Sequence, residues 1–153
     1  MTASPATTMS MELTLPNQLG YELIARDAIA AFARRLGMPM DRVDDMKTAL
    51  CEACINAIEH GNLLNPDLRV HILCHVDAER FVIEVYDQGL RRFVPPSSLP
   101  NIADKLNGTG SLRGMGLLLI SQLSDESGFV PRDEAGNCFR FAFQRSGAAH
   151  GCR

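Results

Sequence analysis

The sequence predicts an α+β fold, a two-layer sandwich in which a mixed, mostly antiparallel sheet packs on three helices. Four strand-like segments form two pairs, 68–76 with 81–86 and 126–130 with 137–143, and a short polar turn joins each pair. Tight hairpins of this kind require antiparallel strands. Helix-like segments separate these strands from one another and from the N-terminus, which gives the order β-α-α-β-β-loop-α-β-β.

A short strand and a helix begin the predicted domain. Residues 11–15 alternate between apolar and polar side chains until Pro16, and proline is disfavoured within a strand. From 19 to 36 the apolar residues recur at helical spacing, and Gly37 follows. Because glycine is the usual residue just past a helix, we expect this helix to end there.

The second helix is predicted to open at Pro39 and Asp41, with Asp41 as its N-cap, and to end at Gly61-Asn62. One narrow arc of this helix is apolar and should face the sheet. The arc contains Val43, Met46, Leu50, Cys54 and Ala57. Glu52, Asn56 and His60 fall on a different arc, so we expect the helix to present polar side chains on a second face.

An irregular segment from about 90 to 113 follows the first hairpin, rich in proline, serine and glycine. A loop of this length inside a compact domain is usually functional, often a lid. Residues 116–123 are apolar nearly all round, which predicts a buried third helix. In the last strand Phe139, Phe141 and Phe143 alternate, so they should share one face.

Length and charge limit the possible functions. The chain has 153 residues, enough for one domain with a real core, which we place at 11–145 between disordered tails at 1–10 and 146–153. A net charge of -3 argues against a broad nucleic-acid or membrane-surface footprint. No apolar run approaches the roughly 20 residues that span a bilayer. The N-terminus lacks the features of a secretory signal, so a cytoplasmic protein is expected.

The cysteines raise the question of a metal or redox site. Cys51 and Cys54 form a C-x-x-C motif, but it lies inside the helical pattern, so we interpret both as small buried hydrophobes. Strand alternation places His71 and His75 on one face and Cys74 on the other. A site with three ligands there is therefore not expected.

Glu52 and Asn56 form the most informative pair in the chain. Residues four apart share one helix face, so a carboxylate and a carboxamide would lie one above the other. Such a pair suits a hard metal ion and the orientation of a hydroxyl or water, although two solvated helix residues would look the same. Two glycine-bearing turns downstream, Asp87-Gln88-Gly89 and 113–116, could complete a nucleotide site.

The familiar nucleotide and hydrolase signatures are absent from the sequence. There is no P-loop, and Gly108-Thr109-Gly110 is followed by Arg113 where a dinucleotide fingerprint needs its third glycine. No serine nucleophile elbow, zinc-protease motif or motif of the eukaryotic protein kinases occurs.

Three segments instead resemble the boxes of the GHKL (histidine kinase-like) ATPase superfamily. The stretch from Glu52 to Gly61 resembles the N-box, Asp87-Gln88-Gly89 the G1 box, and 113–117 the G2 box. The position two residues after Gly89 departs from this pattern, because many members have another glycine where this chain has Arg91. The short length and the first strand–helix pair resemble the anti-sigma-factor serine/threonine kinases of bacterial partner-switching systems. This resemblance implies the Bergerat form of the α+β sandwich.

The resemblance also implies an activity and partners. The protein would bind ATP and Mg²⁺ and phosphorylate a serine or threonine of a STAS-type anti-sigma factor antagonist. It would sequester a sigma factor and form a homodimer, without direct contact to nucleic acid or membrane.

The resemblance assigns separate roles to the site residues. Asn56 would be the metal ligand, and Glu52 would accept a proton from the incoming hydroxyl or orient it. Asp87 would accept a hydrogen bond from the adenine amino group, and Gly89 would allow the turn beneath the base. The expected nucleotide-binding residues are Asn56, Asp87, Gly89, Lys105, Arg113, Gly114, Met115, Gly116 and Leu117. Among them, the two later glycines would approach phosphates at a helix N-terminus, and Lys105 or Arg113 would neutralise phosphate charge.

Other functions remain compatible with the sequence. The chain could be a regulatory binding module of the same fold, with or without bound nucleotide, that never transfers phosphate. It could be the ATPase half of a histidine kinase, although no phospho-acceptor helical hairpin precedes the domain, or a structural protein. The intact Glu52 favours the kinase, since a pure binding module could dispense with it.

Overall fold

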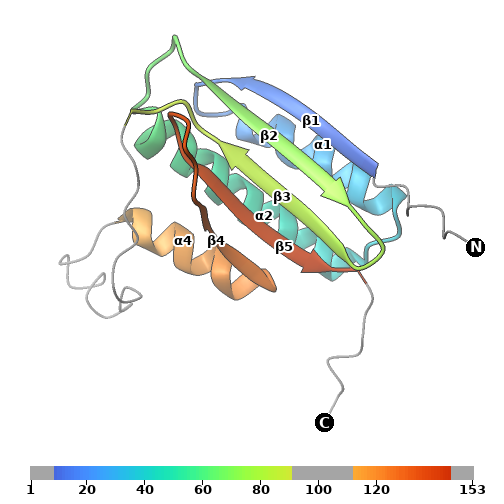
Figure 1. Ribbon diagram of the computed structural model, residues 1–153. Helices are drawn as coiled ribbons and strands as arrows, with labels where there is room; N and C mark the ends of the chain where they lie inside the picture. The colour runs from blue at the N-terminus through green and yellow to red at the C-terminus, as the bar shows by residue number, and fades with distance from the viewer. Residues whose placement is uncertain (1–8, 91–111, 146–153) are drawn as a thin grey trace, which may run out of the picture.

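The computed structural model describes residues 9–90 and 112–145. Its central element is an antiparallel sheet with the strand order β1-β2-β3-β5-β4 (Figure 1). The five strands are β1 (Met9–Pro16), β2 (Arg69–Val76), β3 (Arg80–Tyr86), β4 (Glu126–Val130) and β5 (Cys138–Gln144). The predicted α+β class is confirmed. Every strand pair in this part of the chain is antiparallel, so the parallel component of a mixed sheet is not found here.

The helices lie together on one side of the sheet (Figure 1). They are α1 (Glu22–Arg35), α2 (Met40–Asn56), which continues into one π-helical turn, η1 (Ala57–Gly61), and α4 (Leu112–Leu123). The first helix ends as predicted, with Gly37 at a φ of 85°. A π-turn inside a helix is uncommon and is frequently found at functional sites.

The prediction of Asp41 as an N-cap is wrong. Pro39 is the residue before α2, its ψ of 148° is extended, and no side chain caps the helix. Because helical geometry begins directly after this proline, Asp41 falls within the first turn. There its carboxylate still interacts favourably with the helix dipole.

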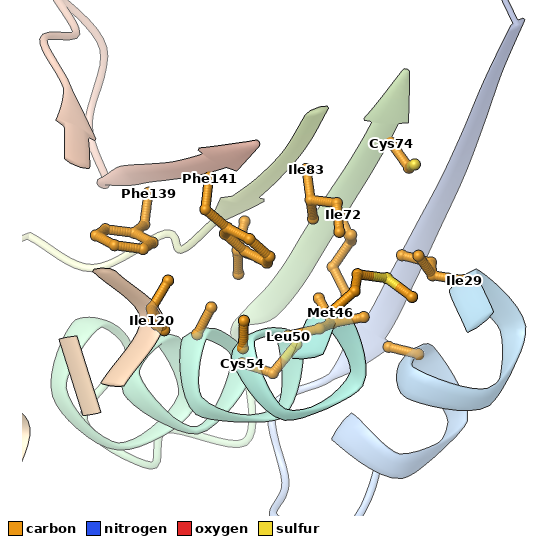
Figure 2. Close-up of a cluster of buried hydrophobic side chains, with 14 of the residues drawn as sticks. Ile29, Met46, Leu50, Cys54, Ile72, Cys74, Ile83, Ile120, Phe139 and Phe141 are labelled. Carbon is orange, nitrogen blue, oxygen red and sulfur yellow. The ribbon is translucent and has the colours of Figure 1, made fainter. Parts of the chain in front are cut away.

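The apolar arc of α2 forms the centre of the core, as predicted. Val43, Met46, Leu50 and Cys54 are completely shielded from solvent. Figure 2 shows these helix side chains meeting Ile72 and Ile83 of the central strands, flanked by Ile29 of α1 and Ile120 of α4. This packing fixes the helix to the sheet along its length, so the backbone that carries its polar residues is fixed as well.

The phenylalanines of β5 share the core face, as their alternation predicts. Phe141 and Phe143 are fully buried, and the ring centroids of Phe139 and Phe141 lie 6.3 Å apart. Phe129 of β4 contacts Phe139 edge-on, with centroids 5.0 Å apart. Figure 2 shows Phe139 and Phe141 on the side of the core next to Ile120 of α4.

The third helix differs from its prediction in start and burial. It begins at Leu112 rather than 116, so Gly114 and Gly116 are helical and do not form a turn. Among residues 114–123, the part of this helix whose burial the structure describes, only Gly116 and Ile120 are buried. The helix packs mainly on α2, at the margin of the helical layer, which leaves the leucines at 117–119 half-buried.

Several sequence predictions concern segments at the margins of the described structure. The first strand begins at Met9, two residues before the predicted start. The predicted tail residues 1–8 and 146–153, and most of the predicted lid (91–111), lie outside the described residues. None of the helices within 9–90 and 112–145 has the length and apolarity required to cross a membrane.

Truncation of the central core residue tests this packing. Leu50→Ala removes a fully buried side chain and should lower the free energy of unfolding by about 2–5 kcal/mol, because a cavity remains under the sheet. Urea unfolding followed by circular dichroism measures the change. Ile24→Ala on α1, where the native side chain is 56% exposed, is the control and should change stability by less than about 0.5 kcal/mol. Equal losses in the two variants would contradict the assigned core.

Candidate functional site

Asp87 lies at the end of β3 and is buried, with 5% of its surface exposed. Its Oδ1 accepts hydrogen bonds from the backbone N–H groups of Gly89 (3.1 Å) and Asn137 (2.9 Å). The Asn137 carboxamide Nδ2 donates to Oδ1 at 3.3 Å and to Oδ2 at 3.2 Å. A buried carboxylate needs such donors. The bonds fix the carboxylate in one orientation and leave Oδ2 with fewer protein donors than Oδ1.

Glycines surround Asp87 closely. A Cβ at Gly61 would lie 2.0 Å from Asp87 Oδ2, and one at Gly136 would lie 2.2 Å from the Asp87 carbonyl oxygen. A Cβ at Gly89 would lie 1.8 Å from the Gly61 carbonyl oxygen. Real side chains do not tolerate these distances. The η1 end, the β3 end and the β4–β5 turn therefore meet around Asp87 through backbone atoms.

Glu52 and Asn56 lie on the α2 side that faces α4. A Cβ at Gly116 would lie 2.8 Å from Glu52 Oε2 and 3.6 Å from Asn56 Nδ2, so α4 approaches both side chains closely at this glycine. Asn56 is 9% exposed, and Glu52 is half-buried. Within residues 9–90 and 112–145 neither side chain has a hydrogen bond or an ion pair. A buried carboxamide without a partner is costly and points to a ligand.

A small cavity of about 10 Å³ connects the two halves of the site. Its lining comes from α2, β3, β5, α4 and β4. The lining residues are Ala53, Asn56, Ala57, Val85, Asp87, Leu117, Phe129, Asn137 and Phe139. A cavity of this size holds about one water molecule. A ring-shaped ligand would therefore enter only if α4 and the walls beside it separated.

The structure brings most of the predicted site residues together. Asn56, Asp87 and Leu117 line one cavity, Gly116 contacts Glu52, and Gly89 contacts the end of η1. Gly114 is half-buried and Met115 exposed in the first part of α4. Arg113 belongs to the same turn, but its side chain, like all of Lys105, lies outside the described structure.

The donor set fits a hard cation and a phosphate chain. The oxygens of Glu52 and Asn56 are the ligand type that Mg²⁺ prefers, and neither side chain bonds to another group in the part of the protein that the structure describes. Because Gly116 has no side chain, these two side chains remain accessible from the N-terminal half of α4. The helix dipole favours anions at that end of the helix.

Sequence inspection missed Asn137 and Phe129 as lining residues. Asn137 reaches Asp87 because the Asp87 N–H donates to the Asn137 carbonyl oxygen (3.0 Å), extending the β3–β5 pairing. The adjacent Gly136, at a φ of 93°, is the only local signal, since it marks a tight turn before the last strand. The pairing itself joins residues 50 apart in sequence.

The cysteines and histidines do not form a second site in the described part of the chain. Burial raises the pKa of the Cys54 and Cys74 thiols, as it does for half-buried Cys51. Burial also raises the pKa of Cys138 to about 12, so these thiols stay protonated at neutral pH. No cluster of three or more His, Cys, Asp or Glu side chains suited to a metal occurs there.

Known proteins resemble the chain over most of its length. A family model described as "Histidine kinase-like ATPase domain" matches residues 15–143. The chain is 30% identical over 123 residues to serine-protein kinase RsbW of Bacillus subtilis (strain 168), covering 76% of this chain and 74% of that protein. Serine-protein kinase RsbW of Bacillus licheniformis matches with the same identity and coverage.

A solved structure resembles the chain in fold. It is the crystal structure of the RsbU and RsbW domains of Rv1364c from Mycobacterium tuberculosis, with a TM-score of 0.59 and 17% sequence identity. The match covers 90% of this chain and 33% of that chain. At this identity the likeness shows the shared architecture.

A methyl group at Gly61 tests the close packing around Asp87. Gly61→Ala places a Cβ against a buried carboxylate that hydrogen bonds hold in place, and should lower the free energy of unfolding by about 1–3 kcal/mol. Gly128→Ala in β4 is the matched control, because nothing lies within 4 Å of its Cβ position. Thermal and urea unfolding of both variants provide the measurement. Wild-type stability of Gly61→Ala would show that this contact is looser than described.

Proposed function

The chain belongs to the histidine kinase-like ATPase family, as a relative of the RsbW serine-protein kinases, and on this premise we propose that it binds ATP with Mg²⁺ and phosphorylates a protein. The substrate is a serine or threonine of a STAS-type anti-sigma factor antagonist. The observation that carries the proposal is the pair Glu52 and Asn56, which faces α4 beside the cavity that Asp87 lines and has no partner among the described residues.

Asp87 recognises the adenine. Four contacts from Gly89 and Asn137 hold its carboxylate, and Oδ2 takes only one of them. An acceptor oxygen with spare capacity at a cavity wall suits the exocyclic amino group of adenine. The same oxygen would face the carbonyl oxygen of guanine or hypoxanthine and repel it.

Glu52 and Asn56 serve the transfer of the γ-phosphoryl group. The acceptor hydroxyl oxygen bonds to the γ-phosphorus, the bond from that phosphorus to the β–γ bridging oxygen breaks, and ADP leaves. Glu52 orients the hydroxyl and accepts its proton; its carboxylate is half-buried and has no ion-pair partner among the described residues. Asn56 supplies a carboxamide oxygen to Mg²⁺, and the bound ion neutralises phosphate charge.

The N-terminal half of α4 receives the phosphates. Its helix dipole and the bare backbone at Gly114 and Gly116 favour anions at close range. Arg113, Lys105, Met115 and Leu117 complete the phosphate and nucleotide contacts. Because the cavity beside α4 is only about 10 Å³, nucleotide binding requires α4 to shift away from the β4–β5 side.

The partners follow from the kinase proposal. The protein acts in the cytoplasm as a homodimeric anti-sigma factor, and it releases or retains a sigma factor according to the phosphorylation of the antagonist. The net charge of -3 supports protein partners over nucleic acid or a membrane surface. The serine-protein kinases to which the chain is 30% identical support a serine acceptor.

Substitution of the pair separates binding from transfer. Glu52→Ala should retain ATP binding and lose phosphotransfer by about 100-fold or more, because the group that accepts the proton is gone. Asn56→Ala should lose the Mg²⁺-dependent part of ATP binding. Calorimetry with ATP, with and without Mg²⁺, measures binding, and radiolabelled ATP with a STAS-domain substrate measures transfer.

Glu126→Ala provides the control, since this glutamate on β4 is 62% exposed and pairs only with Arg80. It should behave like the wild type in both assays. If Glu52→Ala transfers phosphate normally, the role assigned to Glu52 is wrong. Binding of ATP by the wild type without transfer to any STAS-domain substrate would favour a regulatory binding module of the same fold.

A further inference from the structure

Asn62 links the end of the helix that carries Glu52 and Asn56 to residues 87–89, the Asp87 loop. It directly follows η1, and 1% of its surface is exposed. Its Nδ2 donates to Asn17 Oδ1 and to the Arg69 carbonyl oxygen, both at 3.0 Å, and its Oδ1 accepts from the Gln88 N–H at 2.7 Å. One buried carboxamide therefore joins three segments that are 45, 7 and 26 residues away in sequence.

The hydrogen bond between Gln88 and Asn62 lies beside the close backbone approach of Gly61 and Gly89, where neither residue has a side chain. Gln88 stands between Asp87 and Gly89. A Cβ at Gly89 would collide with the Gly61 carbonyl oxygen, and a Cβ at Gly61 would collide with the Asp87 side chain. Without side chains at these glycines there is no interlocking to keep the two backbones together. The hydrogen bond from the Gln88 N–H to Asn62 Oδ1 supplies a directional link at this point, beside the bond that Gln88 Oε1 accepts from the Arg69 N–H.

The backbone after Asn62 indicates that its position is strongly determined. Leu63 and Leu64 have φ angles of 52° and 59°, the left-handed region that leucine rarely adopts, and both are exposed. Such strain persists only where the surrounding contacts over-determine the conformation, and it clusters at functional sites. The buried side-chain bonds of Asn62, together with the backbone bond from the Leu64 N–H to the Ile58 carbonyl oxygen (2.9 Å), hold this segment.

We propose that Asn62 is a positioning residue for nucleobase recognition. It fixes the Asp87 loop on the end of η1 and so sets the preference for a purine with an amino group at position 6, as in adenine, over one with a carbonyl oxygen there. This inference rests on the proposed adenine recognition by Asp87. Discrimination requires the acceptor oxygen to stay at hydrogen-bond distance from the amino group. Without the bond to Asn62 the Asp87 loop could move, so that Asp87 would no longer repel the carbonyl oxygen of hypoxanthine and would bind adenine and hypoxanthine with similar, weak affinity.

Asn17 offers a matched control within the same network. It is 3% exposed, bonds to Asn62 and donates to the Asn65 carbonyl oxygen at 2.9 Å, but none of these bonds reaches residues 87–89. Its loss should destabilise the fold much as the loss of Asn62 does. It leaves the bond from Asn62 to Gln88 in place, so base preference should be retained.

The experiment compares ATP with inosine triphosphate, which has a carbonyl oxygen in place of the adenine amino group. Calorimetry with Mg²⁺ gives the ratio of the two dissociation constants for the wild type, Asn62→Ala and Asn17→Ala, with thermal unfolding in parallel. The wild type should prefer ATP by about tenfold or more, the value of one good hydrogen bond. Asn62→Ala should bring the ratio close to one, and Asn17→Ala should keep it.

Further variants distinguish positioning from general stability. Asn62→Asp keeps an acceptor for the Gln88 N–H and should restore most of the ratio. If Asn62→Ala does not fold, Asn62→Ser carries the test, because its hydroxyl keeps a polar group there but is too short to reach Gln88. A full ATP preference in folded Asn62→Ala or Asn62→Ser, or equal losses in the Asn62 and Asn17 variants, would overturn the positioning role. A wild type that does not bind ATP would instead overturn the proposed function, and this inference with it.

Discussion

The buried carboxylate of Asp87 is the constraint on which the site depends. A charge with 5% exposure is tolerated only if donors surround it, and Asn137 and Gly89 provide them. Gly89 lies two residues from Asp87, whereas Asn137 reaches the carboxylate only after β3 and β5 have paired. The glycines at 61, 89 and 136 allow the three backbones to approach one another. The need to stabilise one charge thus explains why residues far apart in sequence are fixed relative to each other.

The second half of the site has the opposite character. Asp87 is held in place by protein donors, whereas Glu52 and Asn56 have no partner in the described structure. Their helix is rigid because Leu50 and its neighbours are locked under the sheet (Figure 2), so the two side chains remain positioned without bonds of their own. This division suits a kinase: the group that reads the base is preorganised by the protein, and the groups that meet the metal and the hydroxyl stay available.

The sequence predicted what depends on local pattern and missed what depends on long-range pairing. Periodicity identified the α2 core arc and the β5 phenylalanines, and the three boxes pointed to residues that do converge. The N-cap assignment failed because Pro39 already directs the chain into the helix at Met40. The sequence predicted a turn at Gly116, which is helical, because its close neighbour Glu52 lies on another helix. Asn137 and Asn62 could not be found, since their hydrogen-bond partners lie 50 and 26 residues away.

Binding of ATP to Asp87→Asn is the most direct test of the central claim that this carboxylate reads adenine. The substitution is nearly isosteric, but it removes the charge and makes one oxygen a donor where the adenine amino group needs an acceptor. Calorimetry with ATP and Mg²⁺, on protein shown to be folded by circular dichroism, should give a dissociation constant about 100-fold or more above that of the wild type. A folded Asp87→Asn protein that binds ATP as tightly as the wild type would contradict the account.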